Sequence, residues 1–133
     1  MDSKLTILAV DDNSISLATI EQEFKRSYEV IALNSGIRAL QYLSQKTPPD
    51  LILLDVQMAP LDGIETLRQI REMENCQEIP VIMLTSQREK QTIVESSKLG
   101  INDYVLKPFK TQDLHERIER VLKAEVDKRL DNR

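Results

Sequence analysis

Short apolar runs alternate along this chain with longer segments whose apolar residues recur every three or four positions. Runs of strand length lie at residues 5–10, 28–33, 51–54, 80–84 and 103–106. The segments between and after them predict helices at about 15–25, from 36 to before the Pro48-Pro49 pair, 63–73, 87–99 and from 111 onward. Five strand–helix alternations predict an α/β layered fold, one domain with a mostly parallel sheet and right-handed crossovers.

The run at residues 51–54 predicts the centre of that sheet. Its four consecutive aliphatic residues do not alternate with polar ones, which is typical of a strand buried on both faces. The run ends in Asp55, and ligands of open parallel sheets bind just beyond the carboxyl ends of the strands. A lone Asp at this place more often only begins a turn, so the interpretation of Asp55 depends on its neighbours.

The predicted helices differ in how well they can be anchored. Apolar positions expected to face the core in the first helix are Ile15, Leu17, Ala18, Ile20 and Phe24. Asp62, with Glu65 three residues later, predicts the N-cap of the third helix. The helix at 87–99 has little more than Ile93, Val94 and Leu99 to bury, so we expect it to have low local stability.

Composition narrows the class of protein. The 133 residues are 41% hydrophobic and 30% charged, which fits one globular domain. The net charge of -4 gives no electrostatic reason to expect direct nucleic-acid binding. Cys76 is the single cysteine, which excludes an intrachain disulfide and indicates a reducing compartment. The first apolar run is too short for a membrane or signal segment, so we expect a cytoplasmic protein without a membrane partner.

Polar residues follow four of the five predicted strands. They are Asp11-Asp12, Asp55, Thr85 and Lys107. Because the carboxyl ends of parallel strands lie along one edge, we expect these side chains to share a crevice. Three carboxylates and one ammonium would carry a net charge of about -2, which a divalent cation would neutralise. All-oxygen ligands without His or Cys favour Mg²⁺ over zinc.

The same residues suit an aspartyl phosphate. A phosphoryl group on Asp55 would add negative charge, which Lys107 and the metal could neutralise, and the Thr85 hydroxyl could donate to a phosphoryl oxygen. A carboxylate nucleophile with these neighbours is typical of phosphoryl transfer to aspartate.

With these residues the chain resembles the CheY-like receiver domains of two-component response regulators. The resemblance covers nearly the whole chain and is carried by Val10-Asp11-Asp12, Leu53-Leu54-Asp55 followed by Asp62-Gly63, Thr85, and Lys107-Pro108-Phe109. It implies a flavodoxin-like three-layer sandwich with strand order 2-1-3-4-5 and five helices. It also implies a phosphoacceptor in a phosphorelay, not an enzyme except toward its own phosphorylation and dephosphorylation.

The resemblance assigns roles at the site. Asp55 is implied as the phosphorylated residue, and Mg²⁺ as held by Asp12, Asp55 and the backbone carbonyl of Gln57, with Asp11 acting through water. Lys107 is implied to pair with the phosphoryl group. The implied donor is a phosphohistidine on a sensor histidine kinase or a histidine phosphotransfer protein.

The resemblance also implies a switch. Thr85 would report the phosphoryl group, Tyr104 would be the switching aromatic, and the surface near residues 87–122 would change. A homodimer through the last two helices and the last strand is a further implied arrangement. Judged from the residues alone, Tyr104 is more simply interpreted as a half-buried strand aromatic that needs no switch. A cis peptide is implied between Lys107 and Pro108.

Two positions depart from the family pattern. Ala59 follows Met58 where the family usually has proline, and Pro60 comes one position late, which affects the expected loop shape and the Gln57 ligand. Ser86 follows Thr85 where a small apolar residue is common, which could alter access to the phosphoryl group.

Other functional classes fit less well. A phosphohydrolase resembling the haloacid dehalogenases needs an acid two residues after the nucleophile, where Gln57 stands. A flavodoxin-type carrier would have its FMN phosphate repelled by Asp11-Asp12. A domain that acts without phosphorylation would have no need of the retained acids, Thr85 and Lys107. His115 is interpreted as a surface residue remote from the strand ends.

The end of the chain leaves two interpretations open. We expect a receiver domain at residues 1–124 and, at 125–133, a helical extension or the start of a linker to an output domain. The apolar stripe continues through Val126 and Leu130 in a charged segment. That pattern fits a solvated tail or a helical stalk that pairs with a second copy.

Overall fold

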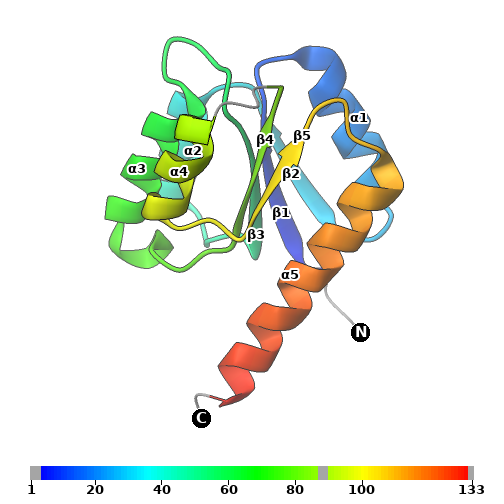
Figure 1. Cartoon of the computed structure of the whole chain (residues 1–133). Helices are drawn as coiled ribbons and strands as arrows, with labels where there is room; N and C mark the ends of the chain where they lie inside the picture. The colour runs from blue at the N-terminus through cyan, green and yellow to red at the C-terminus, as the bar shows by residue number, and fades with distance from the viewer. Residues whose placement is uncertain (1–3, 87–89, 132–133) are drawn as a thin grey trace.

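The computed structural model describes residues 4–86 and 90–131, which form a three-layer α/β sandwich (Figure 1). Five parallel strands lie in the order β2-β1-β3-β4-β5, which confirms the predicted fold and strand order. The strands are β1 (Thr6–Val10), β2 (Glu29–Leu33), β3 (Leu51–Asp55), β4 (Val81–Thr85) and β5 (Asp103–Leu106). The helices are α1 (Ser14–Phe24), α2 (Gly36–Gln45), α3 (Gly63–Glu72), the short 3₁₀ turn η1 (Glu74–Cys76), α4 (Lys90–Leu99) and α5 (Thr111–Asp131).

The helices cover both faces of the sheet. Helices α1 and α5 lie on one face, and α2, α3 and α4 lie on the other (Figure 1). Strand β3 supplies both cores, because successive strand side chains point to opposite faces. Leu51 and Leu53 pack with the α1–α5 side, whereas Ile52 and Leu54 pack with the α2–α4 side. All four are fully buried, as the unbroken aliphatic run predicts.

The start of α3 explains the Asp62-Gly63 pair. The Asp62 carboxylate accepts a hydrogen bond from the Glu65 N–H at 2.8 Å, which confirms the predicted N-cap. A Cβ at Gly63 would collide with the backbone carbonyl of Asp55. Glycine therefore lets α3 begin directly against the end of β3.

Two of the positions in α1 that were expected to face the core are exposed instead. Ile15 is 78% exposed and Ala18 is also exposed, so α1 is buried through its later residues Ile20 and Phe24. The apolar spacing within α1 predicts which side of the helix faces the core. It does not show that the first turn of α1 lies beyond the neighbouring elements.

Helix α4 buries little apolar surface, as its sparse apolar residues predict. Ile93 and Val94 are exposed by 37% and 40%, and Leu99 packs only partly against the core. Among residues 91–99 of the helix, the buried one is Ser96, whose hydroxyl donates to the Thr92 carbonyl at 2.9 Å. The predicted start of this helix at Gln87 lies outside the described residues.

His115 is not a simple surface residue. Its ring is half-buried and packs against Phe24 and Tyr28, with ring centroids 5.2 and 6.1 Å apart. The interpretation as a surface residue is therefore wrong, because it ignored the packing of α5 against the end of α1. His115 Nδ1 also lies 3.1 Å from the Glu119 carboxylate.

Helix α5 runs without a break from Thr111 to Asp131 and extends below the sheet (Figure 1). Val126 and Leu130 are exposed by 46% and 53% on this extension. The proposed division of the chain at residue 124 stays a prediction. No helix within the described ranges 4–86 and 90–131 is long and apolar enough to cross a membrane.

Candidate functional site

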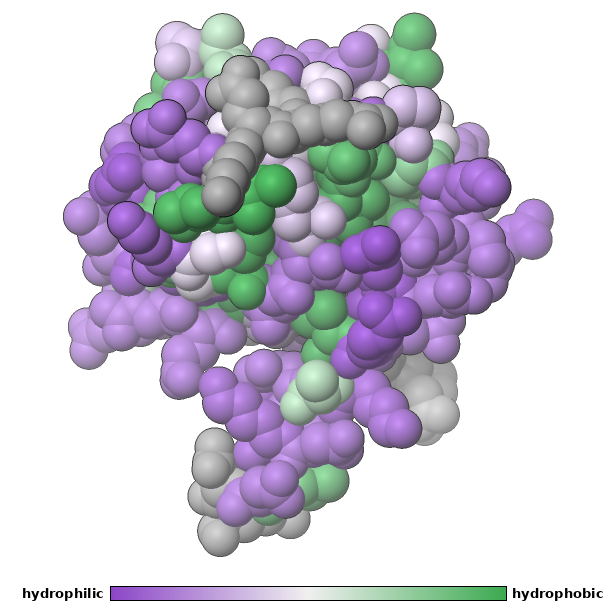
Figure 2. Space-filling view, viewed as in Figure 1, coloured by the Kyte–Doolittle hydropathy of each residue, from purple (hydrophilic) through white to green (hydrophobic). Residues whose placement is uncertain are grey.

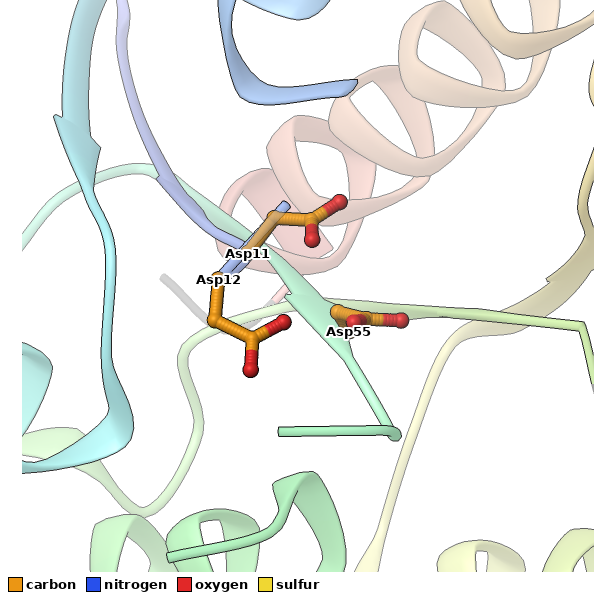
Figure 3. Close-up of side chains that lie close together, drawn as sticks. All are labelled: Asp11, Asp12 and Asp55. Atoms are coloured by element: carbon orange, nitrogen blue, oxygen red, sulfur yellow. The ribbon is translucent and has the colours of Figure 1, made fainter. Parts of the chain in front are cut away.

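Three carboxylates meet at the carboxyl edge of the sheet. Asp11 and Asp12 follow β1, and Asp55 closes the adjacent parallel strand β3. One carboxylate oxygen from each lies within 4.8 Å of the others (Figure 3). The topology thus brings together residues that are far apart in sequence, as the strand-end pattern predicts.

Lys107 follows β5, the outermost strand of the sheet, and reaches these carboxylates along the same edge. Its Nζ lies 2.6 Å from Asp11 Oδ2 and 3.4 Å from Asp55 Oδ1. Asp11 is fully buried and Asp55 is 3% exposed, whereas Asp12 is exposed to solvent. Because Lys107 directly follows β5, its position depends on the whole sheet being assembled.

The electrostatics of the site leave excess negative charge. Burial raises the pKa of Asp55 to about 6, and the negative charge of Asp11 adds to the rise. The Lys107 ammonium and a hydrogen bond from the Gln57 backbone lower the pKa of Asp55 but do not restore its usual value. Asp55 Oδ1 is buried and makes no hydrogen bond to the described residues. The single Lys107 ammonium therefore does not neutralise the charge of the three carboxylates.

This donor set fits a hard divalent cation. The three clustered ligand groups are carboxylates, which suit Mg²⁺ better than a softer metal. An ion beside Asp55 would favour its charged form and would add to the single ion pair that Asp55 Oδ1 makes with Lys107. The predicted ligand role of the Gln57 carbonyl stays a prediction.

Thr85 and Tyr104 lie on the neighbouring strands. Thr85 closes β4, is fully buried and accepts a hydrogen bond from the Lys107 N–H through its carbonyl at 2.7 Å. Tyr104 lies in β5 opposite Met83 and packs partly buried against the α2–α4 core. Thr85 is therefore beside the acidic site, while the reporting role of Thr85 and the switching role of Tyr104 stay predictions.

The backbone next to the site has one expected and one unexpected feature. The Lys107–Pro108 peptide is cis, as the resemblance implied. The Ala59–Pro60 peptide is also cis, which was not predicted although the shifted proline marked this loop as unusual.

The side chain of Gln57 makes a contact that the sequence does not indicate. Gln57 Oε1 accepts hydrogen bonds from the Ser86 N–H at 3.1 Å and from the Ser86 hydroxyl at 2.6 Å. One signal in the sequence marked this position, since Ser86 departs from the family pattern beside Thr85. It did not indicate the partner of Ser86.

A groove lies next to Lys107, between the start of α1 and the segment joining β5 to α5. Its volume is about 340 Å³, and Ile15, Lys107, Pro108 and Phe109 are among its lining residues. Exposed apolar surface thus borders the acidic site.

Comparison with known proteins gives a consistent family. The model of the response regulator receiver domain matches residues 7–119. The chain is 31% identical over 120 residues to chemotaxis protein CheY1 of Helicobacter pylori, covering 89% of this chain and 97% of CheY1. It is 36% identical over 118 residues to the alkaline phosphatase synthesis transcriptional regulatory protein PhoP of Bacillus subtilis, covering 88% of this chain but 48% of PhoP. The chain therefore spans about half the length of that regulator.

A solved structure agrees with this comparison. The receiver domain of sensor histidine kinase PA1611 from Pseudomonas aeruginosa is 31% identical, with a TM-score of 0.82, covering 91% of this chain and 99% of that chain. That structure has a magnesium ion coordinated in its active site cleft.

Proposed function

Because this chain belongs to the response regulator receiver domain family, we propose that Asp55 accepts a phosphoryl group in a Mg²⁺-dependent phosphorelay step. The observation that carries this proposal is the cluster of Asp11, Asp12 and Asp55 with Lys107 bridging two of its members. Such a cluster accommodates both a divalent cation and the extra charge of an acyl phosphate.

The donor in this proposal is a phosphohistidine on a sensor histidine kinase or a histidine phosphotransfer protein. An oxygen of the Asp55 carboxylate attacks phosphorus, the bond from phosphorus to the histidine nitrogen breaks, and the imidazole leaves. When bound by Asp11, Asp12, Asp55 and the Gln57 carbonyl, Mg²⁺ would supply charge neutralisation. Lys107 lies beside Asp55 Oδ1 and would hold a phosphoryl oxygen, so positioning and charge supply the catalysis.

The groove beside Lys107 supports the choice of a protein donor. Ile15, Pro108 and Phe109 border the groove, and Ile15 is 78% exposed. Exposed apolar residues rimmed by polar ones are typical of protein interaction sites. We propose that the partner docks here, with its histidine directed toward Asp55.

The proposed response is a change of the surface near residues 87–122, with Thr85 reporting the phosphoryl group and Tyr104 moving with it. Helix α4 is poorly anchored, so alternative positions would be close in energy. Hydrophobic surface lies between α4 and α5 (Figure 2), and Ile93, Val94 and Leu106 are exposed. This surface supports a homodimer through α4, β5 and α5.

The remaining features of the proposal concern the whole protein. We propose that it acts in the cytoplasm, without direct nucleic-acid binding by this domain, and catalyses only its own phosphorylation and dephosphorylation. We also propose residues 1–124 as the receiver unit and residues 125–133 as a helical extension, or the start of a linker to an output domain.

The test is phosphorylation followed by mass spectrometry of the intact protein. With Mg²⁺ and a small phosphodonor such as acetyl phosphate, the protein should gain the mass of one phosphoryl group, and chelation of Mg²⁺ should abolish the gain. Asp55→Asn should gain none, whereas Asp127→Asn on the exposed end of α5 should behave as wild type. An equal gain in Asp55→Asn would refute the proposal.

A further inference from the structure

Gln57 connects the two loops that border the site. Its backbone follows Asp55 by two residues, while its side chain reaches the loop after β4. There, Gln57 Oε1 accepts from both the N–H and the hydroxyl of Ser86, at 3.1 and 2.6 Å. One acceptor therefore occupies both hydrogen-bond donors of Ser86.

Ser86 borders the acidic site. It follows Thr85 and lines the same groove as Lys107, whose ammonium contacts Asp55. A phosphoryl group adds strong acceptor oxygens at Asp55. These oxygens and the Gln57 amide would compete for the donors of Ser86.

We propose that the Gln57 side chain is a positioning residue, a latch that holds Ser86 in the unphosphorylated arrangement and so opposes phosphorylation of Asp55. This inference rests on the proposed function, since it assigns a regulation to the same site. The latch acts through Ser86 and not on the reacting atoms. It depends on the pair, because the Ser86 hydroxyl makes the shorter of the two hydrogen bonds.

The strength of the two Gln57–Ser86 hydrogen bonds sets the size of the expected effect on phosphoryl-group binding. Both bonds join neutral groups near the surface, so each contributes modestly. Removing the acceptor should shift the equilibrium toward a phosphoryl-like ligand by roughly two- to tenfold.

The test uses beryllofluoride as the probe for the phosphoryl group, titrated into the full chain at saturating Mg²⁺ by calorimetry. Gln57→Met removes the acceptor and keeps the length of the side chain, so beryllofluoride should bind roughly two- to tenfold more tightly. In a Ser86→Ala background the same substitution should give a smaller gain, because the shorter bond is already absent. Gln22→Met, on the exposed side of α1, is the matched control and should leave the affinity unchanged.

The outcomes separate the latch from the function on which it rests. Failure of the wild-type chain to bind beryllofluoride with Mg²⁺ would overturn the proposed function. Binding by wild type without a gain in Gln57→Met would overturn the latch alone. A gain of equal size with and without the Ser86 hydroxyl would also overturn the latch, since Gln57 would then act independently of that bond.

Discussion

Strand β3 contains two regions that are equally buried and chemically opposite. Leu51 to Leu54 are fully buried aliphatic residues that pack on both faces of the sheet, and Asp55, the next residue, is 3% exposed. Burial stabilises the folded state through the aliphatic residues but opposes ionisation of the aspartate. The aliphatic interior of the sheet therefore stabilises the fold, whereas holding like charges close together at its carboxyl edge destabilises it.

The largest expected effect comes from the interior. Leu53→Ala should lower the free energy of unfolding by about 2–5 kcal/mol, because it removes buried methyl groups and leaves a cavity in the centre of the sheet. Urea unfolding followed by circular dichroism measures the change. Ile15→Ala, at a 78% exposed position, is the control and should change the free energy by less than about 0.5 kcal/mol. Similar losses at both positions would contradict the described core.

The buried centre of the sheet and the cluster of polar residues at its carboxyl edge could both be predicted from the sequence, for the same reason. An unbroken aliphatic run indicates a central parallel strand, and parallel topology then forces the strand ends to one edge. Asp11, Asp55 and Lys107 therefore could be placed together without knowing any side-chain conformation. The resemblance to receiver domains added the strand order and the cis peptide before Pro108.

The second expected effect is the loss of folding stability caused by the buried charge of Asp55. In metal-free protein the pKa of Asp55 is about 6, above the usual 3.8 of the unfolded chain, so the folded state binds more protons between these values. Raising the pH through this range therefore lowers stability, and the full loss is reached above pH about 6. Asp55→Asn removes the charge and should be more stable than wild type by about 1–3 kcal/mol at pH 8.

This gain should shrink as the pH falls toward 4, because Asp55 is then protonated in the folded state and increasingly protonated in the unfolded chain. Urea unfolding in chelator at pH 4.5 and pH 8 measures the difference. Asp127→Asn, at an exposed position, should show no such pH dependence. A stability difference for Asp55→Asn that is the same at both pH values would show that the charge of Asp55 is not the cause.

Added Mg²⁺ should offset the destabilisation caused by the charge of Asp55. Mg²⁺ at ten times its dissociation constant should stabilise the wild-type fold by about 1.4 kcal/mol, because only the folded state brings the carboxylates together. The melting temperature should rise by a few degrees at pH 8 and by less below pH 6, where Mg²⁺ must displace a proton from Asp55. Scanning calorimetry with and without Mg²⁺ measures this. An equal rise in Asp55→Asn would place the metal elsewhere.

What the sequence did not reveal depends on tertiary contacts of single side chains. The Gln57 amide can reach Ser86 only because β3 and β4 pair in register, with Asp55 opposite Leu84. His115 is covered because α5 packs beside the end of α1, and no periodicity within α5 reports that neighbour. Ile15 was wrongly assigned to the core for the converse reason, since a regular apolar pattern does not show where a neighbouring surface ends.

The smallest expected effect concerns α4, the helix that follows the edge residue Thr85. Val94 is 40% exposed, so Val94→Ala should lower the free energy of unfolding by less than about 0.5 kcal/mol. Leu67→Ala on α3, a helix on the same face with a fully buried leucine, should lower it by about 2–5 kcal/mol. Backbone amides of α4 should also exchange with deuterium faster than those of α3. If Val94→Ala matched Leu67→Ala, or if both helices were equally protected, α4 would belong to the rigid interior and could not serve as the proposed switch.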